Sequence, residues 1–241
     1  MAAKRSWQWW GVAALIVVLL AGAAIEGGTY VYIHYIEKQA PQALDVTTAT
    51  TPADSSGAAS AAPVPVAGAW KVTSGSLVGY RVKEVLFGQH TEAYGRTPSA
   101  SGTLTISGTS VDAASFTADL TSVHSDQSRR DAQFQGRIMD TAQFPTATFV
   151  LTAPIDFGTV PAPGTAVTHS ATGKLTLHGV THTVTFPVKA VRKGALLEVS
   201  GQVPVTFADY RIPNPSFGGV STDDHGVLEF LLVMEKSSKK G

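Results

Sequence analysis

The chain contains no cysteine and no excess of charge of either sign. The absence of cysteine excludes disulfides, thiolate metal ligands and a cysteine nucleophile. Because 18 basic residues balance 18 acidic ones, the chain also lacks the basic excess typical of proteins that bind nucleic acid. The G-x-S-x-G signature of serine hydrolases and the P-loop of nucleotide-binding proteins are missing as well. What is present, 241 residues of which 44% are hydrophobic, suffices for one sizeable domain and an accessory segment.

One long uncharged run, residues 7–25, lies near the N-terminus. It is long enough for a helix to cross a hydrocarbon core about 30 Å thick. Lys4 and Arg5 precede it, and the positive-inside rule then places the N-terminus in the cytoplasm and the rest of the chain outside. We therefore expect residues 1–39 to form a cytoplasmic tip and a single-pass transmembrane anchor. A cleaved signal peptide is the alternative, although its apolar region is usually only about 7 to 15 residues long.

Residues 40–69 are rich in Ala, Thr, Ser and Pro and contain no Lys, Arg or aromatic residue. Such a segment buries too little apolar surface to offset the entropy of ordering it. We therefore expect a flexible linker with an r.m.s. reach of roughly 30 Å. One domain over residues 70–235 and a basic tail over residues 236–241 complete the predicted organisation.

From Trp70 onward, apolar and polar residues alternate, which indicates β-strands with one buried face. Around Tyr80, for example, Val78 and Val82 share its face and Arg81 points the other way. The pattern recurs at 102–107, 115–122, 147–152, 173–178, 180–190, 196–207 and 226–235. These eight or nine strands predict an all-β fold, either a sandwich or an antiparallel barrel.

The segment 125–140 interrupts this alternation. Phe134 and Ile138 lie four residues apart, which predicts a short helix that presses both side chains on the sheet, with Ser125 or Ser128 as its N-cap. The charged residues 126–131 in this segment are either a solvated salt-bridged face or a functional cluster. Further along, residues 207–230 hold two prolines and several aromatic residues between strong strands, as expected for a packed loop or for the rim of a cavity.

Two histidines, His178 and His182, lie four residues apart in the stretch LHGVTH. On a helix this spacing lets both imidazoles bind one metal ion, as in the H-E-x-x-H motif of zinc proteases. However, residues 180–185 are rich in β-branched side chains, which disfavour a helix, and Gly179 occupies the place of the catalytic glutamate. We therefore predict two strands joined by a tight turn at residues 178–180, with His182 facing inward. A metal site completed by other histidines is the minor alternative.

Four stretches of the chain, in order, resemble the YceI-like family of bacterial exported domains: residues 70–85, 128–152, 173–188 and 207–233. The resemblance covers about residues 70–235. It implies a lipocalin-like antiparallel β-barrel around a long apolar cavity. It also implies a bound polyisoprenoid, such as a prenyl phosphate or a quinone, in the periplasm or outside the cell, and no enzymatic activity.

Inward-facing apolar and aromatic residues are the candidates for the ligand site. On the strands these are Tyr80, Val82, Phe116, Leu120, Phe149, Leu151, Val184, Phe186, Val205 and Phe207. Phe134, Ile138 and Phe217 are expected near an opening, and His182 is the candidate polar contact. If the ligand carries a phosphate, Arg81, Arg96, Arg129, Arg137 or Arg211 is expected to meet it. Ordinary core packing is the competing interpretation for each apolar residue.

These observations lead to one main hypothesis and two alternatives. The main hypothesis is a membrane-anchored, extracytoplasmic protein that holds an isoprenoid lipid or quinone inside a barrel, with no metal, no other cofactor and no nucleic-acid partner. The first alternative is a cell-envelope interaction or stress-related scaffold whose barrel is filled by side chains. The second is a histidine-metal hydrolase.

Overall fold

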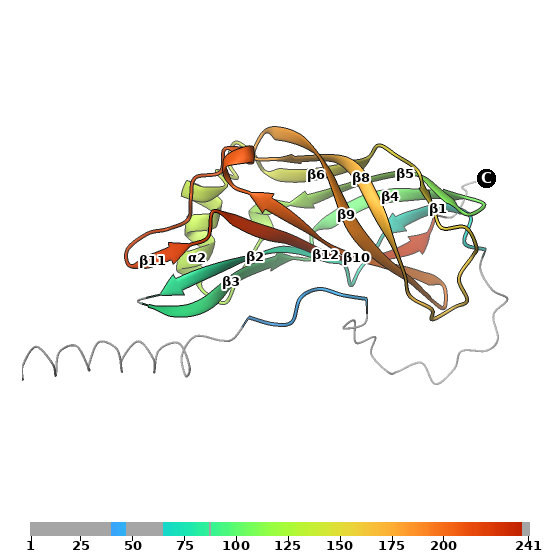
Figure 1. The fold of residues 1–241 in the computed structure, drawn as a ribbon, viewed down its shortest axis with the longest axis horizontal. Helices are drawn as coiled ribbons and strands as arrows, with labels where there is room; N and C mark the ends of the chain where they lie inside the picture. Colours follow the sequence, from blue (N-terminus) through green and yellow to red (C-terminus); the bar gives the residue numbers. More distant parts are fainter. Residues whose placement is uncertain (1–39, 47–64, 87, 238–241) are drawn as a thin grey trace, which may run out of the picture.

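The computed structural model describes residues 40–46, 65–86 and 88–237, and its centre is a closed antiparallel β-barrel (Figure 1). Eight strands form the ring. In spatial order they are β1 (Gly68–Val72), β4 (Ala100–Ser107), β5 (Ser110–Asp119), β6 (Thr146–Leu151), β8 (Val167–Leu177), β9 (Val180–Lys193), β10 (Leu196–Thr206) and β12 (His225–Lys236). Pairing of β12 with β1 closes the ring. The predicted all-β barrel is therefore confirmed.

Four further strands extend the wall. β2 (Leu77–Leu86) pairs with β12 next to the stretch that β1 occupies, and β3 (Gln89–Thr97) pairs with β2. The short strands β7 (Ile155–Asp156) and β11 (Val220–Thr222) pair with β5 and β2. The sequence pattern did not predict β3, because its residues QHTEAYGRT are mostly polar and lack the alternation of large apolar side chains.

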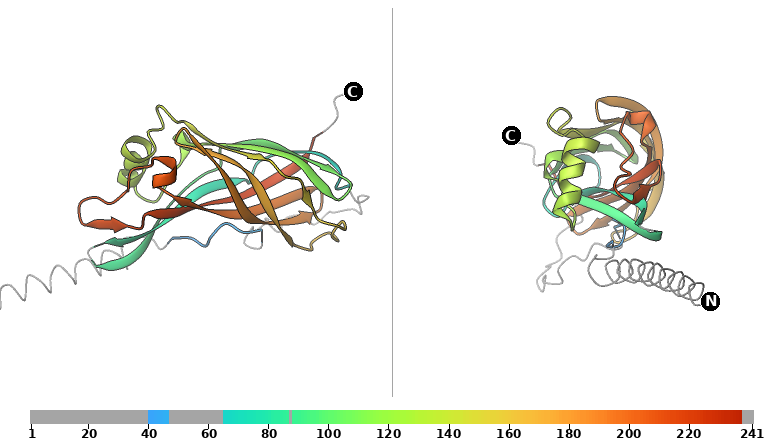
Figure 2. Two further views of the ribbon diagram at one scale, coloured as in Figure 1. Left: turned by 45° about the horizontal axis from the view of Figure 1, so that its top comes forward. Right: turned by 90° about the vertical axis from the view of Figure 1, so that its left-hand side faces the viewer.

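A short helix, α2 (Ser128–Gln133), lies across one end of the barrel, followed by a π-helical turn, Phe134–Ile138 (Figure 2). Phe134 is buried, and its ring stacks on that of Tyr80 with the centroids 4.9 Å apart. The expected helix over the barrel end is confirmed. The expected serine cap is wrong, because Gln127 is the N-cap and makes no side-chain capping bond, whereas Ser125 bonds to Asp131 instead.

The LHGVTH stretch forms a two-residue hairpin turn between β8 and β9. Leu177 pairs with Val180, and both intervening residues, His178 (φ 49°) and Gly179 (φ 74°), have positive φ. Two consecutive positive φ values are typical of a type I′ turn, whose twist matches that of the flanking strands. The predicted tight turn is confirmed, and the helix that a zinc-protease motif needs does not form.

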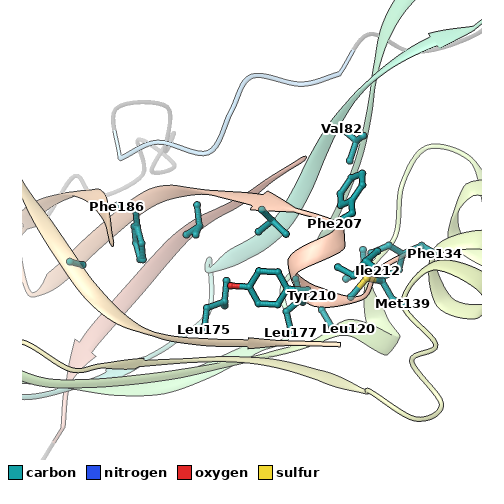
Figure 3. Packing of buried hydrophobic residues seen from close by; sticks show 14 residues of the cluster. Val82, Leu120, Phe134, Met139, Leu175, Leu177, Phe186, Phe207, Tyr210 and Ile212 are labelled. Atoms are coloured by element: carbon teal, nitrogen blue, oxygen red, sulfur yellow. The ribbon is translucent and has the colours of Figure 1, made fainter. Parts of the chain in front are cut away.

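The apolar residues on the inner face of the barrel form two clusters. One lies towards α2 and includes Phe134, Met139, Phe207 and Ile212 (Figure 3). The other lies towards the opposite end and is centred on Trp70 and Met234, which are fully buried. The barrel therefore has apolar walls along its whole length.

Seven residues of the expected flexible linker, 40–46, pack against the outer wall of the barrel (Figure 1); we call them the strap. Leu44 and Val46 are 6% and 1% exposed and contact Leu77, Val191 and Leu231. The physical reason is local composition, since the strap holds two large apolar residues, Leu44 and Val46, next to Asp45 in an otherwise Ala-rich, Pro-rich and polar segment. The remainder of the expected linker before residue 65, like the expected anchor at 7–25, lies outside the described residues. Within the described ranges, no helix has the length and hydropathy to span a membrane.

Candidate functional site

The barrel encloses a cavity of about 920 Å³. This volume lies in the upper part of the range, about 300–1,000 Å³, that is usual for ligand pockets. Its lining residues on β10 run from Leu197 to Val205, which is about 26 Å along a strand. With the strand tilt of roughly 40° that barrels adopt, the cavity extends about 20 Å along the axis. Its shape and length suit an extended chain.

Glycines on the inner wall keep this cavity open, because aromatic rings lie over them on the neighbouring strand. In three direct cross-strand pairs, a Cβ added to the glycine would stand only 2.6 Å from a ring atom. These pairs are Gly95–Tyr80, Gly102–Phe116 and Gly201–Phe230. A ring that lies over a glycine covers the wall of a barrel without projecting into its lumen. The aromatic residues therefore line the cavity and do not fill it.

Twelve of the fourteen candidate ligand-site residues line this cavity. They are Tyr80, Val82, Phe116, Leu120, Phe134, Ile138, Phe149, Leu151, Phe186, Val205, Phe207 and Phe217. Val184 does not reach it and packs against the core cluster instead. That the lining residues bind a ligand stays a prediction. Residues that sequence reasoning left out, such as Leu197, Val199 and Phe230, line the far half; extending the alternation along β10 and β12 would have found them.

His182 does not face the cavity as expected. Its side chain is exposed, its Nε2 lies 2.9 Å from the carbonyl oxygen of Asp209, and its ring meets the edge of Tyr210. His178 similarly contacts the carbonyl oxygen of Tyr210, at 3.2 Å. Both histidines therefore hold the β8–β9 turn to the segment 208–210. Over residues 40–46, 65–86 and 88–237, no three His, Asp or Glu side chains are grouped to hold a metal ion.

The end of the cavity near α2 carries several polar groups among its apolar walls. Tyr80, Glu84 and Arg130 line it, and Arg130 forms ion pairs with Asp126 and Glu84. Although burial by itself lowers the pKa of Arg130, these two carboxylates hold that pKa above its ordinary value. Burial is the main cause that raises the pKa of the Tyr80 phenol, so Tyr80 stays a neutral hydroxyl at physiological pH. The cavity thus offers a hydroxyl and an ion-paired arginine to the polar head of a ligand.

Asp126 adds an unsatisfied acceptor to this polar end. Its side chain is only 6% exposed, and its Oδ2 is buried with no hydrogen-bond partner among the described residues. A buried oxygen without a partner is costly unless a ligand or water donates to it. Of the charged residues between 126 and 131, for which the sequence left two interpretations open, Arg129 and Arg130 line the cavity, and Asp126 pairs with Arg130 beside it.

The five candidate phosphate-binding arginines differ in position, and Arg211, which caps the turn at residues 208–210, is exposed and does not line the cavity. Arg129 and Arg137 line the cavity near its opening, and Arg137 stacks over Phe217 with 5.7 Å between its Cζ and the ring centroid. Arg81 and Arg96 point out of the barrel, where their Nε atoms each lie 2.8 Å from a different oxygen of Glu229. Both guanidinium groups are bound by Glu229 and the strap, and the expectation that an arginine meets a phosphate at the mouth of the cavity stays a prediction.

Glu229 and the two arginines form a buried ionic cluster under the strap. The side chain of Glu229 is fully buried, and the backbone N–H of Leu44 donates to its Oε2 at 3.0 Å. Arg81 also donates to the carbonyl oxygen of Pro41, and Arg96 to that of Gln42. The sequence held one signal for this cluster: charged residues at outward positions of two strands that are otherwise strongly apolar.

Comparison with known proteins agrees with this fold. A model of the YceI-like domain matches residues 70–234. One similar solved structure is a polyisoprenoid binding domain from Saccharophagus degradans implicated in plant cell wall breakdown; it is 20% identical, covers 70% of this chain and 98% of its own, and gives a TM-score of 0.56. Another is BcnA from Burkholderia cenocepacia, 26% identical over 66% of this chain and 95% of its own, with a TM-score of 0.52. A comparison with curated proteins finds no match.

Proposed function

The chain belongs to the YceI-like family, and we propose that it is a membrane-anchored, extracytoplasmic protein that holds an isoprenoid or similar long apolar chain inside its barrel. The observation that carries the proposal is the elongated cavity of about 920 Å³ with apolar walls at both ends. Burial of each methylene of such a chain contributes about 0.8 kcal/mol, so tight binding needs no catalytic group. The solved relative from Saccharophagus degradans is described as a polyisoprenoid binding domain, which supports the same class of ligand.

The anchoring part of the proposal rests on the sequence. Residues 7–25 are uncharged and apolar, and Lys4 and Arg5 precede them. This arrangement favours a single span with the barrel on the outer side of the membrane. A carrier fixed beside the membrane from which its lipid comes loads and unloads over a short distance.

The scaffold alternative is less well supported. It requires a barrel filled by side chains, whereas the described residues enclose an open cavity. The hydrolase alternative lacks a metal-binding group of residues within the described part of the chain.

The test is extraction of lipid from the full-length chain, purified from membranes in mild detergent, followed by mass spectrometry. We expect one long-chain lipid class at a near-stoichiometric ratio. Phe116→Trp, which enlarges a ring that lines the cavity, should lower that ratio, whereas bulk lipid held around the anchor should not change. An equal lipid profile in both proteins, with no enriched class, would overturn the proposal.

A further inference from the structure

The strap has a definite direction along the barrel. Near its start, the carbonyl oxygen of Pro41 accepts from Arg81, in the middle of β2, whose far end at Leu86 pairs with β11 beside α2. At its end, Val46 accepts from Lys193, next to the β9–β10 turn at the opposite end of the barrel. Ala40 therefore lies at the end of the strap that is nearer to α2 and β11.

The strap is held by several independent contacts. The N–H of Val46 donates to the hydroxyl of Ser200 at 3.2 Å, and Asp45 forms an ion pair with Lys189 at 2.7 Å. Together with the bonds to Arg81, Arg96 and Glu229, these contacts bind the strap to five strands that are neighbours in the wall: β3, β2, β12, β10 and β9. These contacts fix the orientation of the barrel relative to residue 40. The point of attachment is therefore the strap, and not the end of the expected linker at residue 69.

The same end of the barrel carries the opening of the cavity. Four of the five exposed residues that line the cavity belong to α2, its π-helical turn or the loop before β11: Arg129, Arg137, Phe217 and Gly218. Phe217 is 58% exposed, the largest value among the exposed large hydrophobic residues of the described chain. An aromatic ring held in water at the rim of an apolar cavity is typical of a surface that contacts another apolar phase.

We propose that the rim around Phe217 docks on the surface of the membrane, so that the cavity opens directly onto the lipid. This inference rests on the anchor of the proposed function. Only fourteen residues, 26–39, separate the expected span from the strap, and even fully extended they cover at most about 50 Å. Because the strap begins on the side of the cavity opening, we infer that this end faces the membrane. The anchor keeps the rim close to the bilayer, so a weak apolar contact is sufficient for docking.

Charge does not drive this docking. Exposed residues of both signs lie around this end in similar number: Arg129, Arg137, Arg211 and Lys83 against Asp209, Asp223 and Asp224. A rim with so little net charge gains little from anionic lipid, and its binding responds weakly to salt. The partner is therefore the apolar boundary of the bilayer, with Arg137 over the Phe217 ring at the level of the headgroups.

The absence of cysteine allows a direct test. Ala132→Cys on α2 and Ala195→Cys in the β9–β10 turn introduce single thiols at exposed positions at opposite ends of the barrel. Each full-length variant is labelled with the same fluorophore and reconstituted in phosphatidylcholine vesicles that contain a nitroxide-headgroup lipid. We expect at least twofold stronger quenching at position 132 than at position 195. This difference should not change in about 0.5 M salt, which screens charges on the surface. Equal quenching at the two positions would overturn the inference.

Two further variants separate the causes. Phe217→Ser should reduce quenching at position 132, and Leu44→Ser combined with Val46→Ser should reduce it further by releasing the strap. Unchanged quenching in the strap variant would show that the strap does not orient the barrel. Co-sedimentation of the chain with the vesicles is measured in parallel. Loss of co-sedimentation rejects the anchor, and the proposed function with it, whereas co-sedimentation with equal quenching rejects only the docking.

Discussion

The ring of Phe230 lies directly over Gly201, its cross-strand partner in β10, and a Cβ at position 201 would stand 2.6 Å from that ring. Real Cβ atoms essentially never come so close to another heavy atom, so the pair is complementary in shape. The glycine lets the ring lie against the wall, and the wall therefore stays thin enough to leave a cavity. The choice of glycine at position 201 therefore affects the volume of the cavity directly.

Gly201→Ala should push the Phe230 ring into the cavity and lower the amount of bound lipid at least twofold. The unfolding free energy should fall by about 1–3 kcal/mol, as is typical of overpacking. Gly136→Ala is the matched control, because nothing lies within 4 Å of a Cβ at that glycine. Lipid content is measured by extraction and mass spectrometry. Recovery of binding in Gly201→Ala with Phe230→Leu would assign the loss to the ring, and its persistence would contradict this cause.

Glu229→Gln should destabilise the protein strongly. Glu229 is fully buried and binds Arg81, Arg96 and the strap, and breaking one partner of a buried ion pair costs about 3–5 kcal/mol. Glu235→Gln, on the same outward face of β12, breaks an exposed pair with Lys71 and should cost less than about 1 kcal/mol. Urea unfolding measures both variants. Similar losses for the two would mean that the strap does not bury Glu229 in solution.

Tyr80→Phe should make the protein less sensitive to alkali. Burial raises the pKa of the Tyr80 phenol above the ordinary value of about 10. Between the two pKa values the unfolded chain loses a proton that the folded chain keeps, so stability falls as the pH rises above about 10, by up to about 1.4 kcal/mol per pH unit. The substitution removes this contribution. Thermal unfolding at pH 8 to 11 tests it, with Tyr94→Phe as control; parallel pH profiles for all three proteins would refute the assignment.

His182→Ala should leave the lipid content unchanged, because the exposed imidazole does not line the cavity and contacts the carbonyl oxygen of Asp209. The loss of that hydrogen bond should cost no more than about 1 kcal/mol. Elemental analysis of the same preparations should detect no zinc. Reduced lipid content would show that His182 contributes to ligand binding. Zinc that disappears with the substitution would show that His182 is a metal ligand.

The alternation of side chains was sufficient to predict which faces of most strands point inward. Tyr80, Phe116 and Phe186 line the cavity as their positions in the pattern indicate, because the period of a strand leaves no choice once one face is buried. His182 shares that parity, yet its side chain is exposed. The alternation determines only on which side of the wall a side chain begins. His182 lies close to the β8–β9 turn, at the end of the strand, and there its contacts with Asp209 and Tyr210 determine where the imidazole lies.

The choice of a barrel over a sandwich came from the resemblance to the YceI-like family. Local sequence patterns alone were sufficient to predict an all-β fold, the tight turn at His178 and Gly179 and the short helix that carries Phe134. All three depend on local periodicity or on backbone preferences of a few neighbouring residues. Three features could be found only in the folded structure: the packing of the strap on the wall, the binding of Arg81 and Arg96 to Glu229, and the pairing of Asp126 with the cavity-lining Arg130. These features join residues up to 185 positions apart, and their energies arise from desolvation and shape that exist only once the barrel has closed.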